Sequence, residues 1–424
     1  MKIAIIGTGI AGNVAAYKLR QHHDVTVFES GAYIGGHTNT VDVDEAGTSH
    51  AVDTGFIVFN DHTYPNFISL LDEIGQESQP SVMSFSVQQQ ETGLEYAGSS
   101  LNALFAQRRN LLRPAFHRML RDILRFNKEA PPDADRLDDS ETIGAYFAQK
   151  NYGKEFIDQY LVPMAAAIWS AEPGAVLDMP VRFLVRFFAN HGLLQTSGRP
   201  TWRVIKGGSR EYVKKLVAGH RDQIRLNSPV QSIRRVGSEI ELRSASGGNE
   251  NFDYVFVACH SDQALSLLAD PTAAEREILG AIRYQKNEAI LHTDAALMPT
   301  RRLAWAAWNY HIPQDQGRHV AVTYNMNILQ GLNTRKDYLV TLNNDQHIDP
   351  GKIIQRIQYE HPVFSREAIE AQGRQAEINC DRTFFCGAYW RNGFHEDGVV
   401  SALNALQHFE ERLGNAQLYL RRAS

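Results

Sequence analysis

The sequence contains few cysteines, no long apolar run and no strong excess of charge. Its 424 residues include three cysteines, and none of them is spaced as C-x-x-C. Such sparse usage argues against a disulfide framework and favours a reducing compartment. No apolar run is long enough to span a bilayer, and the net charge of −5 gives no electrostatic basis for binding nucleic acid. We therefore expect a cytoplasmic protein without a nucleic-acid partner.

Two chemical motifs are also missing. H-E-x-x-H is absent and His395-Glu396-Asp397 is too compact to form a ligand set, so no metal is expected. Only one G-x-G-x-x-G is present, because Gly207-Gly208 and Gly247-Gly248 lack its spacing. An enzyme that draws electrons from NAD(P)H normally has two such units. Electrons are therefore expected to come from the substrate and to leave to oxygen, a quinone or a partner protein, among which the sequence does not choose.

The amino-terminal residues have the pattern of a dinucleotide-binding βαβ unit. An apolar strand, Lys2–Ile6, leads into Gly7-Thr8-Gly9-Ile10-Ala11-Gly12, a helical stretch, and a second strand that ends before Glu29. The glycines permit a tight turn and a close approach of a diphosphate to the helix N-terminus. A carboxylate at Glu29 accepts hydrogen bonds from ribose hydroxyls and repels a 2′-phosphate. This pattern indicates NAD or the adenosine half of FAD.

The segments that follow decide between these two nucleotides by resemblance. Ser30 and the run Gly35-Gly36-His37-Thr38 come directly after Glu29, and Thr54-Gly55 interrupts the next apolar stretch. This order is similar to that of the flavoprotein superfamily of amine oxidases, phytoene desaturases and protoporphyrinogen oxidases. Three later segments extend the likeness: 224–233, 252–265 and 383–406. In detail the chain most resembles a bacterial branch described as predicted NAD/FAD-binding proteins.

The resemblance implies a non-covalent FAD and a fold of the amine oxidase and phytoene desaturase type. That fold is α/β, with a Rossmann-like FAD-binding domain and a discontinuous α+β substrate domain. We expect the FAD-binding domain at residues 1–75, 200–270 and 375–424, and the substrate domain at 76–199 (a helical insert) and 271–374 (strand-rich). The cofactor-binding residues implied by the glycine turn and the resemblance are Gly7, Gly9, Ile10, Ala11, Gly12, Glu29, Ser30, Gly35, Gly36, His37, Thr38, Thr54, Gly55, Val230, Gly387, Gly398, Val399 and Val400.

Few side chains suggest themselves for catalysis. His395 is the first candidate for an acid or base, because it precedes a helix, beginning near Gly398, that faces the flavin in this superfamily; shaping the loop is its alternative role. Tyr389 and Trp390 are candidates for lining the flavin pocket. Lys286 lies where amine oxidases place a water-holding lysine, although the alignment there is open.

A basic, apolar helical region follows at Leu101–Lys128, with Pro131-Pro132 expected to open a linker and Ser140 to cap the next helix. Its arginines and leucines predict either peripheral contact with an anionic membrane through residues 104–128 or a core helix with a solvated cationic face. Its six arginines are Arg108, Arg109, Arg113, Arg118, Arg121 and Arg125.

These features favour an FAD-dependent oxidoreductase that moves a hydride from a hydrophobic small molecule, preferably an acyl lipid, to flavin N5. The alternatives are a flavin amine oxidase and an enzyme that isomerises or saturates a double bond. A non-enzyme alternative is a flavin-free module on the same fold that binds a lipid or a protein.

Overall fold

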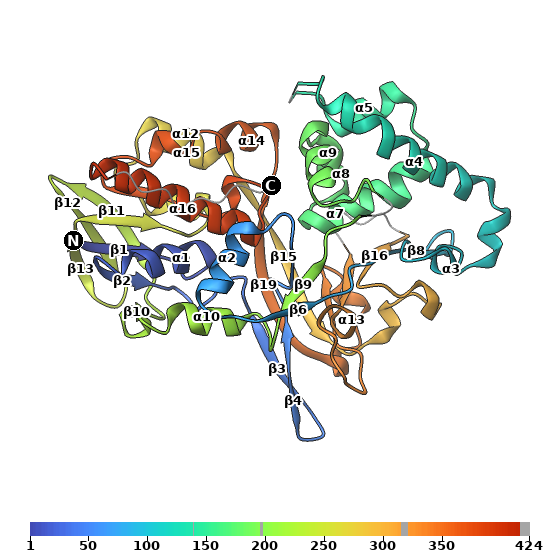
Figure 1. The fold of residues 1–424 in the computed structure, drawn as a ribbon, viewed down its shortest axis with the longest axis horizontal. Helices are drawn as coiled ribbons and strands as arrows, with labels where there is room; N and C mark the ends of the chain where they lie inside the picture. Colours follow the sequence, from blue (N-terminus) through green and yellow to red (C-terminus); the bar gives the residue numbers. More distant parts are fainter. Residues whose placement is uncertain (139, 196–197, 315–320, 416–424) are drawn as a thin grey trace.

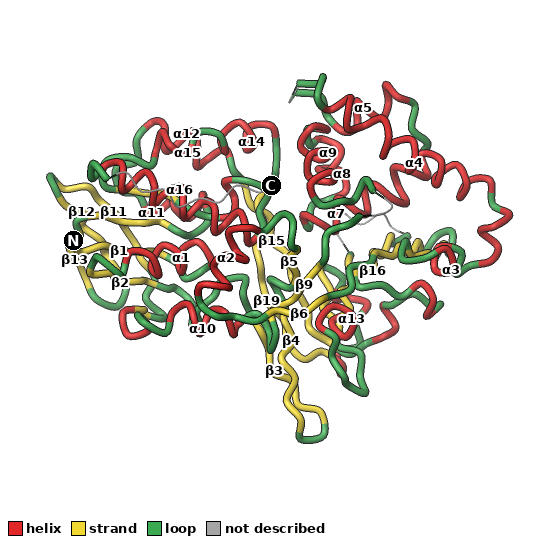
Figure 2. The backbone as a smooth tube through the Cα atoms, viewed as in Figure 1, coloured by secondary structure: helices red, strands yellow, loops and turns green. Residues whose placement is uncertain are grey.

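The computed structural model describes residues 1–424 except 139, 196–197, 315–320 and 416–424. The N-terminus lies in a part built on a parallel sheet, and a cluster of helices lies at the opposite end of the molecule (Figure 1). Strands that belong to a second, larger sheet run between these two ends (Figure 2).

The parallel sheet has the strand order β10-β2-β1-β14-β20. Its strands come from distant parts of the chain: β1 (Lys2–Ile6), β2 (Asp24–Phe28), β10 (Ile224–Arg225), β14 (Tyr254–Val257) and β20 (Thr383–Phe385). Nearly every residue of β1, β14 and β20 is buried, as expected of strands covered on both faces. Such a sheet needs a layer on each side.

Alternate side chains of these strands enter two different cores. Ile3 and Ile5 pack under α1 (Ile10–Leu19), α2 (Pro65–Glu73), α10 (Arg210–Val217) and α16 (His395–Arg412). Ala4 and Ile6 face the antiparallel sheet of β11 (Val230–Val236), β12 (Glu239–Ser244) and β13 (Gly248–Phe252). The period of two along each strand therefore sets the three layers.

The larger sheet has seven strands in the order β19-β15-β18-β17-β16-β7-β8. They are antiparallel neighbours except for β16 and β7, which run parallel. Their bounds are β7 (Phe85–Gln89), β8 (Leu94–Ala97), β15 (Arg283–His292), β16 (Trp308–Ile312), β17 (Val322–Asn325), β18 (Leu339–Leu342) and β19 (Ile353–Val363). Two small sheets complete the strands: the hairpin of β3 (Thr40–Glu45) and β4 (Thr48–Asp53), and β5 (Val58–Asn60) with β9 (Trp202–Ile205) and β6 (Ser78–Pro80).

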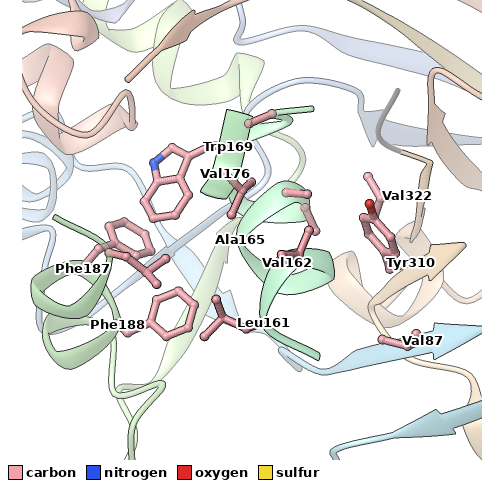
Figure 3. Close-up of a cluster of buried hydrophobic side chains, with 14 of the residues drawn as sticks. Val87, Leu161, Val162, Ala165, Trp169, Val176, Phe187, Phe188, Tyr310 and Val322 are labelled. Carbon is pink, nitrogen blue, oxygen red and sulfur yellow. The ribbon is translucent and has the colours of Figure 1, made fainter. Parts of the chain in front are cut away.

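The helical insert shares one apolar core with this sheet. Side chains of α7 and α9, such as Val162 and Phe188, gather near Tyr310 and Val322 of the strands (Figure 3). The helices are α3 (Leu101–Leu104), α4 (Pro114–Ala134), α5 (Ile143–Lys150), α6 (Lys154–Phe156), α7 (Val162–Trp169), α8 (Pro173–Asp178) and α9 (Val181–Asn190). A further helix, α13 (Met326–Gln330), packs on the same sheet.

The packing does not follow the expected boundary at residue 271. Helices α12 (Ala273–Ala281) and α14 (Arg366–Gln372) were expected in the substrate domain. Their side chains instead join the core under the parallel sheet, together with α11 (Ser261–Leu267) and α15 (Gln375–Ile378). The other expected limits of the two domains stay a prediction.

Two local predictions in the helical insert were wrong. Pro131 and Pro132 lie inside α4, which continues to Ala134, because Ala130 and Ala134 are buried in the core and hold the last turns in place. Thr142, not Ser140, caps α5 by accepting a hydrogen bond from the Ala145 N–H. The Ser140 hydroxyl instead donates to Asp138.

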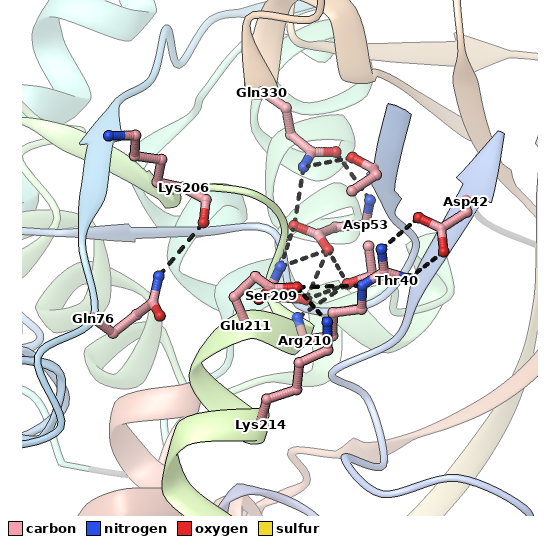
Figure 4. Close-up of polar contacts among 11 residues, drawn as sticks. Thr40, Asp42, Asp53, Gln76, Lys206, Ser209, Arg210, Glu211, Lys214 and Gln330 are labelled. Atoms are coloured by element: carbon pink, nitrogen blue, oxygen red, sulfur yellow. Dashed lines mark hydrogen bonds and ion pairs between the residues drawn. The ribbon is translucent and has the colours of Figure 1, made fainter. Parts of the chain in front are cut away.

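A buried carboxylate joins the two sheets. Asp53, at the end of β4, is fully buried and accepts hydrogen bonds from Thr40, from the Ser209 backbone and hydroxyl, and from the Gln330 amide (Figure 4). Ser209 precedes α10 on the parallel sheet, whereas Gln330 ends α13 on the seven-stranded sheet. Asp53 therefore ties the nucleotide part to the sheet part.

We expect Asp53→Ala to lower the free energy of unfolding by roughly 3 kcal/mol, because it leaves the donors of Ser209 and Gln330 buried and unpaired. Asp42→Ala is the matched control, since Asp42 lies on the same hairpin in an exposed ion pair with Arg210 and should cost less than about 1 kcal/mol. Urea unfolding measures both. Equal losses would contradict the role assigned to Asp53.

Candidate active site

The glycine turn after β1 has the geometry of an anion cradle. Gly7 has φ +98°, and a Cβ on Gly12 would lie 2.0 Å from the Gly7 carbonyl oxygen. A Cβ on Gly9 would meet nothing within 4 Å, so space is open beside the start of α1. The backbone N–H groups of Ile10 and Ala11 belong to the first turn of that helix, where the dipole favours an anion.

Glu29 lies at the carboxyl end of β2, beside this turn. Its half-buried carboxylate accepts hydrogen bonds from the Thr8 N–H at 2.9 Å and the Gly31 N–H at 2.7 Å. The neighbouring backbone of Glu29 accepts from the Ser228 N–H, which brings the start of β11 alongside. Val230 follows two residues later, buried against Phe28. The residues predicted for adenine and ribose therefore lie next to each other.

The second glycine pair lies directly on the first turn. Gly36 has φ +58°, and a Cβ there would lie 3.2 Å from the Gly9 Cα. Likewise, a Cβ on Gly55 would lie 2.2 Å from the His37 carbonyl oxygen. These contacts leave no room for side chains, so the loops holding Ser30, Thr38 and Thr54 converge on the glycine turn.

His37 presents an unpaired ring nitrogen at this point. Its ring stacks on Tyr359 of β19 with centroids 4.8 Å apart and lies 5.3 Å from that of His361. Nε2 is buried without a hydrogen-bond partner. Burial and the neighbouring histidines hold the pKa of His37 well below its usual value. A buried ring nitrogen without a partner fits a polar group of the cofactor as its partner.

The carboxyl-terminal helix meets the same place from the other end of the chain. α16 begins at His395, slightly earlier than expected, and a Cβ on Gly398 would lie 2.5 Å from Ile10 Cγ2. The first turns of α1 and α16 are thus in close contact, with Val399 and Val400 buried behind Gly398. Gly387 precedes this turn, and a Cβ there would lie 2.3 Å from the Tyr389 ring.

His395 does not have the surroundings of the predicted acid or base. Its ring is stacked on Phe56 with centroids 3.5 Å apart, and Nε2 lies 2.8 Å from the Tyr212 hydroxyl and 3.1 Å from that of Thr38. Burial lowers the pKa of His395 to about 3. A neutral histidine held in this way positions the loop before α16, which was the alternative role.

The surroundings of Tyr389, Trp390 and Lys286 also indicate structural roles. Tyr389 and Trp390 pack in the core below the parallel sheet, and Lys286 is exposed on β15 opposite Glu360. Burial raises the pKa of the Cys386 thiol above its usual value, which disfavours the thiolate that a covalent flavin bond needs.

The role of one buried carboxylate at the site, Glu396, was missed by sequence reasoning. Glu396 is buried and accepts hydrogen bonds from the Asn66 and Phe67 N–H groups, so it caps α2. Its partners are more than three hundred positions away in the chain, and no local pattern marks them. Asp397 caps its own helix by accepting from the Phe394 N–H at 2.9 Å.

The assembled cradle fits FAD. The predicted residues run from Val230 and Glu29, through the touching glycine loops and the unpaired Nε2 of His37, to the first turn of α16. No cluster of histidine, cysteine and carboxylate side chains suited to a metal occurs among the described residues.

Comparisons with known proteins decide the family. The family model described as flavin containing amine oxidoreductase matches residues 10–305, which is more than half of the chain. The chain belongs to this family. The protein is therefore an FAD-dependent oxidoreductase.

Individual relatives are more distant. Mitochondrial protoporphyrinogen oxidase of Nicotiana tabacum is 26% identical over 182 residues, which cover 41% of this chain and 34% of that protein. Cyclohexylamine oxidase from Brevibacterium oxydans has a TM-score of 0.69 at 16% identity, covering 98% of this chain and 99% of the other. A CLA-producing fatty acid isomerase from P. acnes has a TM-score of 0.67 at 15% identity, covering 96% and 98%. The structural likenesses establish the fold.

None of the described helices combines the length and the apolarity that crossing a bilayer requires.

We expect Gly398→Ala to weaken FAD binding about tenfold, because the added methyl group overlaps Ile10 and pushes α16 away from α1. Gly174→Ala is the matched control: Gly174 also lies in a helix, α8, but a Cβ there meets nothing within 4 Å. Calorimetric titration of each apoprotein with FAD measures the effect. Unchanged affinity in Gly398→Ala would show that this helix contact does not support the cradle.

The pKa of His395 generates a second prediction. The folded pKa of about 3 lies below that of an unfolded histidine, so stability is present at neutral pH and is lost as the pH falls below about 6.5. Between pH 7 and 5 this single residue should remove about 2 kcal/mol. His395→Gln should lose that part of the pH dependence, whereas His117→Gln, at an exposed position, should keep it. Urea unfolding of the apoprotein at both pH values measures the difference.

Proposed function

We propose that the protein removes hydrogen from a hydrophobic acyl-lipid substrate. Bound FAD supplies the hydride acceptor, flavin N5. The observation that carries the proposal is an aromatic junction, defined by Trp169, Phe183, Phe187, Phe364 and Phe394, in front of the first turn of α16.

The junction connects the helical insert to the nucleotide part. Phe394, directly before α16, stacks on Phe187 of α9 with centroids 5.2 Å apart. Phe187 in turn lies 4.7 Å from the Trp169 ring at the end of α7 (Figure 3). An apolar wall at this position favours a substrate that buries hydrocarbon.

The ionisable groups beside the wall are neutral or already engaged. His191 stacks on Phe187, its Nδ1 lies 2.9 Å from the Phe187 carbonyl, and burial lowers its pKa to about 4. Asp397 is occupied in capping α16. Hydride transfer from a C–H bond requires chiefly that the substrate be held in position, which packing alone achieves.

The unpaired polar atom in the wall indicates the chemistry of the substrate head group. Trp169 is buried, and its Nε1–H has no hydrogen-bond partner. A carbonyl or carboxylate oxygen of an acyl group accepts such a bond, whereas an ammonium group offers only donors. Trp169 therefore positions the acyl head while the hydrocarbon lies against the phenylalanines.

An amine oxidase is the second candidate. The family model and the fold of cyclohexylamine oxidase favour it. The faces of the junction rings would then bind the substrate cation.

Anaerobic titration of the flavoprotein tests the proposal. Acyl lipids or free fatty acids should bleach the visible flavin absorbance, and cyclohexylamine and putrescine should leave it unchanged. Bleaching by the amines alone would replace the proposal with the second candidate.

Two tryptophan variants test whether Trp169 lies in the substrate site. Trp169→Phe removes the unpaired donor and should raise KM for the acyl substrate about tenfold while FAD content stays the same. Trp305→Phe is the matched control, because the Trp305 Nε1–H already donates to the Pro299 carbonyl at 2.7 Å. Equal KM values for the two variants would remove Trp169 from the substrate site.

A further inference from the structure

Four leucines are exposed at the end of the molecule farthest from the N-terminus. Leu112 is 88% exposed, Leu101 78%, Leu303 50% and Leu111 49%. They belong to α3, to η1 (Arg108–Leu112) and to η5 (Arg302–Ala304), and we call them the leucine corner. α3 lies in the right-hand part of Figure 1, away from the N-terminus.

The elements of the corner are fastened to one another. α3 packs against η5, and its Ala103 shares a small core with Ala306 just beyond η5. Arg108 donates to Asn102 and to the Phe105 carbonyl at 2.7 Å, which ties η1 to α3. The three elements that carry the four leucines therefore lie together. Single exposed leucines need no explanation, but several on adjoining elements indicate a binding surface.

Arginines surround the corner without neutralising partners. Arg109 donates to the backbone carbonyl of Gly93, and Arg302 stacks over Trp305. No ion pair joins Arg108, Arg109 or Arg302 to a carboxylate within the described part of the chain. Of the nearby acids, Glu95 forms an ion pair with Arg301, and Glu91 is exposed on the adjacent turn. The balance around the leucines is therefore positive.

The neighbouring helix α4 does not share this exposure. Phe116, Met119 and Phe126 turn its apolar face into the core, with Leu124 as its exposed leucine. The apolar face of α4 is therefore not available to a membrane, and the expected contact through residues 104–128 stays a prediction for the rest of that segment. The apolar surface that remains is the leucine corner.

We propose that the leucine corner docks the protein on an anionic lipid bilayer. Leu111 and Leu112 enter the interfacial region, and the arginines contact lipid phosphates and acidic head groups. A fluid bilayer accepts projecting side chains without a shaped pocket, and it supplies the negative charge that the arginines lack. Each arginine near such a surface contributes about a fivefold gain in partitioning.

The leucine corner packs against the same apolar core as the proposed substrate site. Leu104 and Phe105 are half-buried against the core cluster that also contains Trp169 and Phe187. Docking at this end places the bilayer beside the helical insert, on the side away from the nucleotide cradle. Binding is measured without turnover, so its outcome is independent of the substrate assigned above.

Co-sedimentation of the FAD-loaded protein with vesicles tests the proposal. Phosphatidylcholine vesicles that contain phosphatidylglycerol should pellet the protein, with less binding at high salt and little to phosphatidylcholine alone. Leu111→Ser combined with Leu112→Ser should reduce the bound fraction at least about fivefold. Arg109→Gln combined with Arg302→Gln should reduce binding to the anionic vesicles and leave the weak binding to phosphatidylcholine vesicles unchanged. All variants should keep their FAD content.

Leu124→Ser is the matched control, since Leu124 is 61% exposed on α4 outside the corner and should leave binding unchanged. Absence of binding to anionic vesicles, or equal binding by the Leu111/Leu112 variant, would overturn the proposal. The alternative is that a second copy of the chain binds the leucine corner. Sedimentation velocity tests this by measuring the oligomeric state. Self-association that the leucine substitutions abolish, without vesicle binding, would assign the corner to a dimer.

Discussion

The contact between the first turns of α1 and α16 is the constraint on which the rest of the structure depends. It exists because Gly398 has no side chain to collide with Ile10. Gly12 likewise has no side chain to collide with the Gly7 carbonyl, so the turn before α1 can be tight. Two helix N-termini then face one small region, and their partial positive charges favour a diphosphate and the anionic edge of a reduced flavin. α1 follows β1 and α16 follows β20, and these two strands lie on either side of β14 in the parallel sheet, so both ends of the chain contribute to one sheet and one cradle.

Buried polar groups around the cradle act as long-range fasteners. Asp53 connects α10 with α13, Glu396 caps α2 from the start of α16, and His395 links Thr38 with Tyr212. Each is satisfied by partners that the chain itself supplies. By contrast, His37 Nε2 and Trp169 Nε1 are buried and unpaired. His37 Nε2 is therefore free for a polar group of the cofactor, and Trp169 Nε1–H for the acyl oxygen of the proposed substrate.

Local features of the site could be predicted from the sequence because local geometry determines them. The glycine turn, Glu29 and the Gly35-Gly36 pair follow from spacing near one βαβ unit, and in the structure they lie next to one another. The misses depend on contacts far along the chain. The sequence around His395 does not indicate that Phe56 and Tyr212 enclose its ring. In α4, burial of Ala134 outweighs the tendency of Pro131 to end a helix. The family resemblance supplied what spacing could not, the choice of flavin over nicotinamide.

Because His395 is enclosed and neutral, substrate specificity cannot depend on it as an acid or base. A reaction that needed a side-chain base would require a titratable group in contact with the substrate, but burial keeps His395 and His191 neutral near neutral pH. Direct hydride transfer has no such requirement, because the barrier falls when the C–H bond is held in line with its acceptor. In the proposed function, the side chains that select the substrate are then those that set its position, the aromatic junction and the Nε1–H of Trp169. Variation among members of this family should accordingly concentrate at that junction, while the glycine contacts between α1 and α16 stay fixed.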